Sequence, residues 1–280
     1  MAKIFLLMVD TKQYDIRAIC RAYFEIAKER YSVALLAKLL VFIVGILSLF
    51  PIIYEYSRLI TFFLVITSEF LSYLSDKNKV IAETLLRKLD AQDSFGWSIS
   101  NAEISDIIVN CPSKSEKLNF KDTYFASKEG VGTKRALENV QESAWWSKHL
   151  AKRMGHFYLI GTVLFVVIWL GVVFVGIKTI HNTNNLSALL NILVLALMLL
   201  FSLSLLRSMD SYYKFSNAAE KIEKTIQQLL GTEDIHEYDA IKIMFEYQLV
   251  RNSAPLLPSW LWKSMRDNLN ETWQQYRTAK

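Results

Sequence analysis

Cysteine is nearly absent from this chain of 280 residues, which has only Cys20 and Cys111, far apart in the sequence. Nothing therefore suggests a disulfide framework or a cysteine-based metal site. The four histidines have no carboxylate or cysteine at ligand spacing, and the chain lacks a phosphate-binding glycine loop, a nucleophile elbow and a zinc motif. These absences favour a protein that is not an enzyme and needs no metal or cofactor, although an enzyme stays an alternative.

The chain has no segment in which charged residues of one sign are concentrated. Lysine and arginine number 32 against 27 aspartates and glutamates, a net charge of +5, and no stretch forms a dense basic block. This argues against a nucleic-acid polymer as partner, whereas a modest positive balance is typical of soluble segments that lie against an anionic leaflet. Ile4–Val9 is too short for the core of a signal peptide and lacks a small-residue cleavage site, so we expect no processing.

Long apolar runs, by contrast, dominate the chain. They are Leu39–Tyr54, Leu59–Leu74, Phe157–Ile177 and Leu186–Leu206. The last two have no charged residue for 21 positions each, which at about 1.5 Å per residue crosses a hydrocarbon core of roughly 30 Å. Lys38 can extend its amine outward and so lengthen the first span. We interpret the runs as four transmembrane helices rather than as buried helices of a large soluble protein.

Short polar links join the runs in two pairs, at Glu55–Arg58 and at Lys178–Asn185. Because a short link makes its neighbours antiparallel, we predict two transmembrane helical hairpins. Each link holds one cation, and the other cations near the span ends lie on the opposite side: Arg21, Lys28, Arg30, Lys38, Lys77, Lys79, Lys148, Lys152, Arg153, Arg207, Lys214, Lys221 and Lys224. Since cytoplasmic flanks carry the excess of positive charge, both termini and the middle region are expected in the cytoplasm.

The expected fold class is an all-α membrane protein with mainly helical cytoplasmic regions. The predicted divisions are a cytoplasmic amphipathic helix at 1–38, a first transmembrane hairpin at 39–75, a cytoplasmic middle region at 76–155, a second transmembrane hairpin at 156–207 and a C-terminal cytoplasmic helical region at 208–280. Val80–Leu89 should extend the second span, and Thr133–Met154 should run unbroken into the third. Ser100 and Glu103 are spaced as the capping box of a short helix.

Helical periodicity predicts the buried faces of the helices outside the spans. The first such face holds Ile16, Ile19, Cys20, Tyr23, Phe24 and Tyr31, and the next holds Phe215, Ala219, Ile222, Ile226 and Leu229. Gly231 is placed to end the latter helix. The following helix should bury Tyr238, Ile241, Phe245 and Leu249. Pro258 then opens a last helix with Trp262, Met265, Leu269, Trp273 and Tyr276 on one side.

Glu69 is the one acid inside a span. Intramembrane carboxylates are costly and tend to face a protein interior or a water path, so Glu69 is a candidate pore or gating residue. The alternative is a residue that is hydrated near the cytoplasmic headgroups and has no such role. Asn191, in the fourth span, is expected to make a hydrogen bond between helices.

Tryptophans beside cations are the candidate ligand contacts, because Trp can stack a nucleobase while Arg or Lys neutralises a phosphate. The C-terminal group of this kind comprises Arg251, Trp260, Trp262, Lys263 and Arg266. For this group, ordinary core packing is the alternative. Trp145 and Trp146, just before the third span, fit a membrane anchor better than a ligand contact.

The segment from Arg251 to Trp262 has the spacing Arg, three residues, Pro, two, Pro, one, Trp, one, Trp. This pattern, together with the two hairpins around a cytoplasmic middle region and the segment Val140–Trp146, resembles the SMODS-associating four-transmembrane effector family. One departure is that Met244 and Phe245 stand where a Gln-Asp pair is expected upstream of the arginine. Any role tied to that pair therefore does not transfer to this chain.

The resemblance implies an effector of bacterial antiphage defence of the CBASS type (cyclic-oligonucleotide-based antiphage signalling), located in the inner membrane. Such an effector binds a cyclic di- or trinucleotide that a neighbouring cGAS-like nucleotidyltransferase makes on infection, forms a homo-oligomer and permeabilises the bilayer. The ligand-binding residues would then be Arg251 and Trp260, assisted by Lys263 or Arg266.

Two other classes stay open. A constitutive channel or transporter should line several spans with polar residues, and only Glu69 and Asn191 qualify. A membrane scaffold would recruit a protein partner through its amphipathic helices. Expression of such a scaffold should be harmless with or without cyclic nucleotides, which distinguishes it from an effector.

Overall fold

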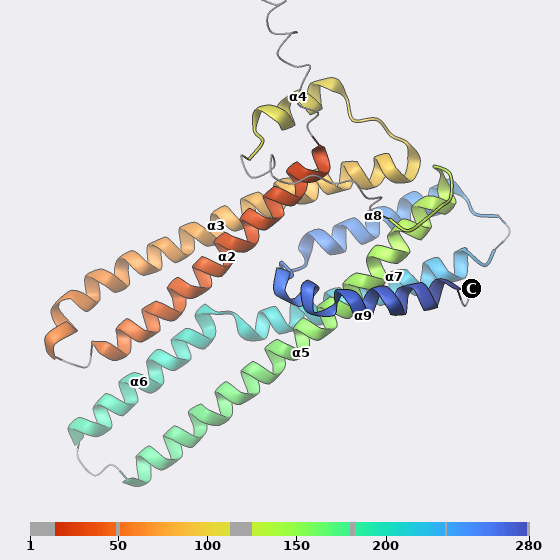
Figure 1. Cartoon of the computed structure of the whole chain (residues 1–280). Coiled ribbons are helices and arrows are strands. Elements are labelled where there is room, and N and C mark those ends of the chain that lie inside the picture. Colours follow the sequence, from red (N-terminus) through yellow and green to blue (C-terminus); the bar gives the residue numbers. More distant parts are fainter. Residues whose placement is uncertain (1–14, 49–50, 113–124, 180–182, 233, 279–280) are drawn as a thin grey trace, which may run out of the picture.

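A computed structural model of the chain describes residues 15–48, 51–112, 125–179, 183–232 and 234–278 (Figure 1). Within these ranges every regular element is an α-helix, so the predicted all-α class is confirmed there. In chain order the helices are α2 (Ile16–Leu47), α3 (Pro51–Phe95), α4 (Asn101–Val109), α5 (Thr133–Thr179), α6 (Thr183–Ser202), α7 (Leu205–Leu229), α8 (Glu237–Ser253) and α9 (Ser259–Thr278).

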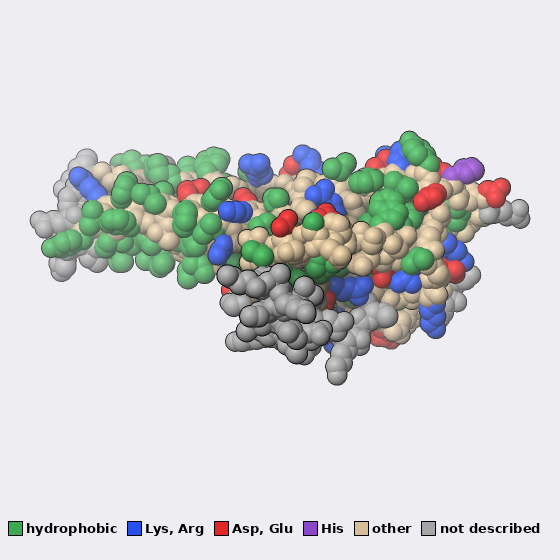
Figure 2. Space-filling model, turned by 90° about the horizontal axis from the view of Figure 1, so that it is seen from above, with side chains coloured by type: hydrophobic (Ala, Val, Ile, Leu, Met, Phe, Trp, Pro, Cys, Tyr) green, Lys and Arg blue, Asp and Glu red, His purple; other side chains and the backbone are tan. Residues whose placement is uncertain are grey.

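Four helical segments are long and apolar enough to contain a membrane span, and this number is as predicted: Ile16–Leu47, Tyr56–Phe95, Thr133–Gly176 and Leu189–Leu229. Large hydrophobic side chains on them face outward, among them Phe62, Val167 and Phe201. Figure 2 shows hydrophobic side chains covering one end of the elongated molecule and charged side chains gathered toward the other. An apolar surface of this extent is what a multi-pass membrane protein presents to lipid.

The turn between α2 and α3 comes earlier than predicted. Helix α2 ends at Leu47 and α3 begins at Pro51, so Glu55–Arg58 lies inside α3 and the prediction that it links the spans is wrong. Proline explains the difference, because the first turn of a helix needs no N–H from it and its fixed φ suits that position. The predicted second link, Lys178–Asn185, overlaps the ends of α5 and α6, and its centre lies outside the described residues.

Two helices continue from their spans far into the rest of the molecule. Helix α3 has 45 residues and α5 has 47, which are lengths of about 70 Å. Val80–Leu89 thus extends the second span and Thr133–Met154 runs into the third, both as predicted. The capping box of Ser100 and Glu103 at the start of α4 is also confirmed.

Three clusters of buried side chains hold the helices together outside the spans. The cluster of α5, α7 and α8 contains Leu137, Val140, Ile222, Ile226, Ile243 and Tyr247. The cluster of α5, α7 and α9 contains Trp145, Leu150, Tyr212, Phe215, Leu269 and Trp273, and the cluster of α2 and α3 contains Ile19, Cys20, Tyr23, Leu85 and Leu89. The faces predicted to be buried upstream of the first span and downstream of the fourth therefore lie in the core.

Helix α8 is turned opposite to the prediction. Tyr238, Phe245 and Leu249 are exposed, whereas Ile243, Met244 and Tyr247 are buried. Apolar residues occur on both sides of this helix, so hydropathy alone cannot choose between them. The buried side also carries Gln248 and Arg251, and Arg251 is buried because it is paired with carboxylates on α3.

A break separates α6 from α7 where the fourth apolar run ends. Ser204 has φ +50°, a left-handed conformation that is uncommon for a residue other than glycine, and α7 starts at the next residue. The break leaves helix carbonyls without their usual partners, and the Lys38 ammonium donates to the Ser202 carbonyl across 3.4 Å. Lys38 thus tethers α2 to the end of α6.

Candidate functional site

A buried ion-paired junction joins α3 to α8 outside the spans. The Arg251 guanidinium lies 3.0 Å from a carboxylate oxygen of Glu83 and 3.0 Å from one of Asp90. It also lies over the ring of Tyr247, with 5.5 Å from its central carbon to the ring centroid. Only 13% of the Arg251 side chain is exposed, so this cation is enclosed by protein groups. The predicted ligand residue Arg251 therefore holds two helices together.

The junction carries two carboxylates against one guanidinium. Burial raises the pKa of Asp90, Arg251 opposes that shift, and the charge of Glu83 raises the pKa further. The neighbouring thiol of Cys20, on the part of α2 before its span, donates to the Ala82 carbonyl. Burial, together with the charges of Asp90 and Glu83, raises the pKa of Cys20 to about 12. Cys20 is therefore an unreactive core residue, because nucleophilic attack needs the thiolate.

A second polar cluster lies further along α3, at Asp93. The Asp93 carboxylate is 3.0 Å from the Arg135 guanidinium of α5 and 3.4 Å from that of Arg17 on α2. Its other oxygen accepts a hydrogen bond of 2.8 Å from the side-chain amide of Asn139. One carboxylate on α3 thus connects three helices.

Lysines supply further polar contacts between the same groups of helices. Lys79 of α3 donates to the Asn252 and Ala254 carbonyls at the end of α8, over 2.8 and 2.5 Å. Lys28 of α2 donates to the Ser259 hydroxyl at the start of α9 over 3.2 Å. The contact of α2 and α3 with α5, α8 and α9 is therefore rich in polar interactions, whereas the contacts of α5 with α7, α8 and α9 are mainly apolar.

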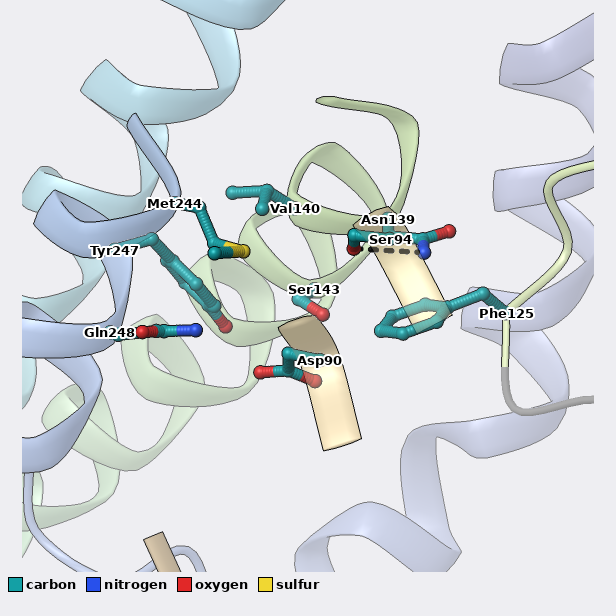
Figure 3. Close-up of a pocket in the computed structure, with 9 residues that line it drawn as sticks. All are labelled: Asp90, Ser94, Phe125, Asn139, Val140, Ser143, Met244, Tyr247 and Gln248. Atoms are coloured by element: carbon teal, nitrogen blue, oxygen red, sulfur yellow. Dashed lines mark hydrogen bonds between the residues drawn. The ribbon is translucent and has the colours of Figure 1, made fainter. Parts of the chain in front are cut away.

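A small cavity lies beside the junction, between α3, α5 and α8 (Figure 3). Its volume is about 10 Å³, enough for one water molecule, and it is lined by Asp90, Ser94, Phe125, Asn139, Val140, Ser143, Met244, Tyr247 and Gln248. Two buried groups on its wall, Asn139 Oδ1 and Gln248 Nε2, have no hydrogen-bond partner among the described residues. A nucleotide does not fit in this cavity.

The other predicted ligand residues lie in the first turns of α9. Trp260 is 52% exposed and meets Phe157, at the start of the third apolar run, with ring centroids 5.7 Å apart. Lys263 is exposed, and the Arg266 guanidinium lies over the Trp262 ring at 5.3 Å. These exposed aromatic and cationic side chains are distributed around the first turns of α9 and are called the α9 surface below, and among them Trp260 contacts the start of the third apolar run. Arg251, by contrast, is turned toward α3.

Trp262 is 39% exposed, whereas helical periodicity predicts it on the buried face of the last helix. The adjacent Leu261 is buried in its place, so that prediction is wrong, while the role of Trp262 as a candidate ligand contact stays a prediction. The anchoring role expected for Trp145 is also wrong, because its side chain is 4% exposed and its ring lies 5.2 Å from that of Trp273. Both errors arise because a tryptophan near a cation can be buried or exposed with the same local sequence.

Glu69 is paired but exposed. Its carboxylate lies 3.1 Å from the Lys38 ammonium, and 67% of its side chain is accessible in the single chain. The carboxylate therefore lies on the outer surface of the protomer, where lipid or another copy would meet it. Asn191 is likewise exposed, and the hydrogen bond predicted for it is not formed among the described residues.

The polar junction is the part of the site that sequence reasoning missed. Its acids, Glu83 and Asp90, look like ordinary surface residues of a charged helix. A signal is present in their spacing, because Glu83 and Asp90 are seven residues apart and share the face of α3 that carries the buried Ala82 and Leu89. Their cationic partner is about 160 residues away, which no local pattern reveals.

Comparisons with known proteins give no further assignment. The chain matches no protein-family model, no curated protein and no solved structure. Similarity therefore assigns neither a family nor a ligand to the site.

Proposed function

We propose that this chain is a membrane effector of bacterial antiphage defence, in which a cytoplasmic helical domain binds a cyclic di- or trinucleotide and drives association and permeabilisation of the inner membrane. The observation that carries the proposal is the continuity of α3 and α5. Helix α3 runs without a break from the ion-paired junction into an apolar span, and α5 does so from the neighbouring Asp93 cluster. A change at the junction would therefore be transmitted to the bilayer by rigid helices.

In this proposal the spans form two transmembrane hairpins, α2 with α3 and α5 with α6, with both termini in the cytoplasm. Helices α2 and α3 lie side by side, as do α5 and α6, which supports the pairing (Figure 1). A single protomer offers few polar groups along its spans. A water path therefore needs several copies, with Glu69 exposed toward the neighbouring copy.

The ligand site is placed on the exposed surface of α9. Trp260 would stack a base, while Lys263 and Arg266 would neutralise phosphates. In this proposal a phosphate of the ligand competes with Glu83 and Asp90 for the Arg251 guanidinium. Exchange of a carboxylate for a phosphate would loosen α8 from α3, which gives ligand binding a direct effect on a helix that enters the membrane.

The test is a thermal-shift screen of the purified protein against cyclic di- and trinucleotides, followed by leakage from liposomes that contain the protein. One nucleotide should raise the melting temperature of the protein. The same nucleotide should cause dye release from the liposomes, and the release should increase steeply with the density of protein in the membrane. Leakage that is equal without nucleotide contradicts ligand gating. Binding without leakage favours the membrane scaffold instead.

Removing the two cations of the α9 surface should weaken nucleotide binding. For the double variant Lys263→Gln/Arg266→Gln we expect a loss of roughly tenfold or more, since each phosphate contact is charge-assisted. The control is Lys214→Gln/Lys224→Gln, which removes the same charge from two exposed residues of α7. Equal losses in both variants indicate a general effect of charge and reject the α9 site.

Thiol labelling tests the proposed orientation. In a Cys20→Ser background, a cysteine at Ser48, beside the turn between α2 and α3, should react with a membrane-impermeant reagent in intact spheroplasts. Cys111, which is half-buried, should react only after permeabilisation. The background removes Cys20, whose burial would prevent labelling on either side of the membrane. Labelling of Cys111 in intact spheroplasts overturns the orientation.

A further inference from the structure

Helix α8 presents a largely exposed apolar stripe. The stripe comprises Tyr238, Ile241, Phe245 and Leu249, spaced three, four and four residues apart, of which only Ile241 is half-buried. Tyr238 is 74% exposed, Phe245 50% and Leu249 66%. This spacing keeps the four side chains on one line along the helix. Large apolar side chains aligned in this way mark an interaction surface.

Charged residues flank the stripe on opposite sides. At 100° per residue, Glu237 lies on one side of the line through Tyr238 and Phe245, and Lys242 lies on the other. Both side chains are exposed, and no ion pair among the described residues uses either of them. Two parallel helices can be related by a two-fold axis. A residue on one flank of the first helix then lies opposite a residue of the second helix that is five positions later in the sequence and on the other flank. Glu237 and Lys242 have this spacing and opposite charge.

We propose that the α8 stripe is a self-association surface that pairs in parallel with the same stripe of a second copy of this chain. Glu237 of each copy then lies opposite Lys242 of the other, and the four apolar residues fill the contact between them. The surface is self-complementary, as a two-fold interface requires.

The direction of α8 in the molecule agrees with parallel pairing. Helix α8 runs along the long axis of the molecule, the axis that ends in the apolar spans (Figure 1). Two copies with parallel α8 helices therefore keep their spans in one bilayer. An antiparallel pair would direct the two sets of spans to opposite sides, which one membrane does not allow.

The charged flanks favour a second copy over lipid as the occupant of the stripe. Glu237 and Asp239 stand at the start of the stripe, and their negative charge is unfavourable against an anionic leaflet. The start of α8 also packs with the end of α7, away from the spans (Figure 1). The inference refines the association step of the proposed function but needs neither the nucleotide nor leakage for its test.

The first test measures the mass of the full chain in detergent across a range of concentrations. The wild type should show a dimer, and Phe245→Asp should raise the half-dimerisation concentration roughly tenfold or more, because the charge would be buried in the centre of the contact. The matched control is Val109→Asp, which adds the same charge at a 79% exposed valine of α4. A wild-type protein that stays monomeric, or equal effects of the two variants, overturns the proposal.

Charge reversal distinguishes self-pairing from every other occupant. Glu237→Lys and Lys242→Glu should each weaken the dimer, and the double variant should restore it, because the ion pair re-forms only between two copies of the same surface. Failure of the double variant to recover rejects parallel self-pairing. Coverage of the stripe by residues 4–9 of the same chain, or by lipid, gives no recovery either. Loss of the dimer with unchanged nucleotide-dependent leakage separates this inference from the proposed function.

Discussion

Replacing Arg251 with alanine is expected to lower the free energy of unfolding by about 3–5 kcal/mol, because it leaves buried carboxylates without their cation. Glu83 and Asp90 are almost completely enclosed, and the guanidinium lies 3.0 Å from each. In the variant one of them must take up a proton or draw in water. We expect a fall of several degrees in the melting temperature of the purified protein.

The control is Arg266→Ala. The guanidinium of Arg266 is about half exposed and should contribute less than about 1 kcal/mol to the free energy of unfolding. Arg251→Lys should fall between the two, since an ammonium keeps the charge but does not reproduce the two-pronged contact. The triple variant Arg251→Met/Glu83→Gln/Asp90→Asn should recover much of the loss by removing the unpaired charges. A melting temperature of Arg251→Ala equal to that of Arg266→Ala would show that the junction does not stabilise the fold.

The membrane helices could be predicted because the signal for them is direct. A run of 21 uncharged residues has few stable environments other than a bilayer, and the unbroken helical pattern of Thr133–Met154 continues into such a run. The capping box at Ser100 and the end of α7 near Gly231 follow from the chemistry of a few adjacent residues. Features of this kind depend on local sequence, so no knowledge of the tertiary contacts is needed.

The orientation of α8 and the junction could not be predicted, because both depend on contacts between distant residues. From its local sequence, Arg251 is predicted to be an exposed phosphate ligand. From theirs, Glu83 and Asp90 are predicted to be acids on the protein surface. Only the packing of α8 on α3 makes them one buried group. The stripe of Tyr238, Phe245 and Leu249 is exposed for the same reason, since burying Arg251 turns the other face of α8 outward.

A proline at Lys152 is expected to uncouple the cytoplasmic domain from the third span. Lys152 is an exposed residue of α5, between the buried Trp145 and the start of the apolar run at Phe157. Proline removes the bond from its N–H to the Lys148 carbonyl and clashes with that carbonyl, at a cost of about 3 kcal/mol or more. The Lys148 carbonyl also accepts a bond of 2.9 Å from the Ser216 hydroxyl, so the kink disturbs the contact with α7 as well.

If α5 transmits binding to the bilayer, Lys152→Pro should bind the cognate nucleotide in a thermal-shift assay and yet lose leakage by roughly a hundredfold at equal protein density, the factor that about 3 kcal/mol represents. Lys152→Ala removes the same side chain without bending the helix, and its leakage should match the wild type. A proline variant that leaks normally with nucleotide would show that coupling runs through α3 alone. One that leaks without nucleotide would show instead that the straight helix holds the spans closed, because breaking α5 then releases them as the ligand does.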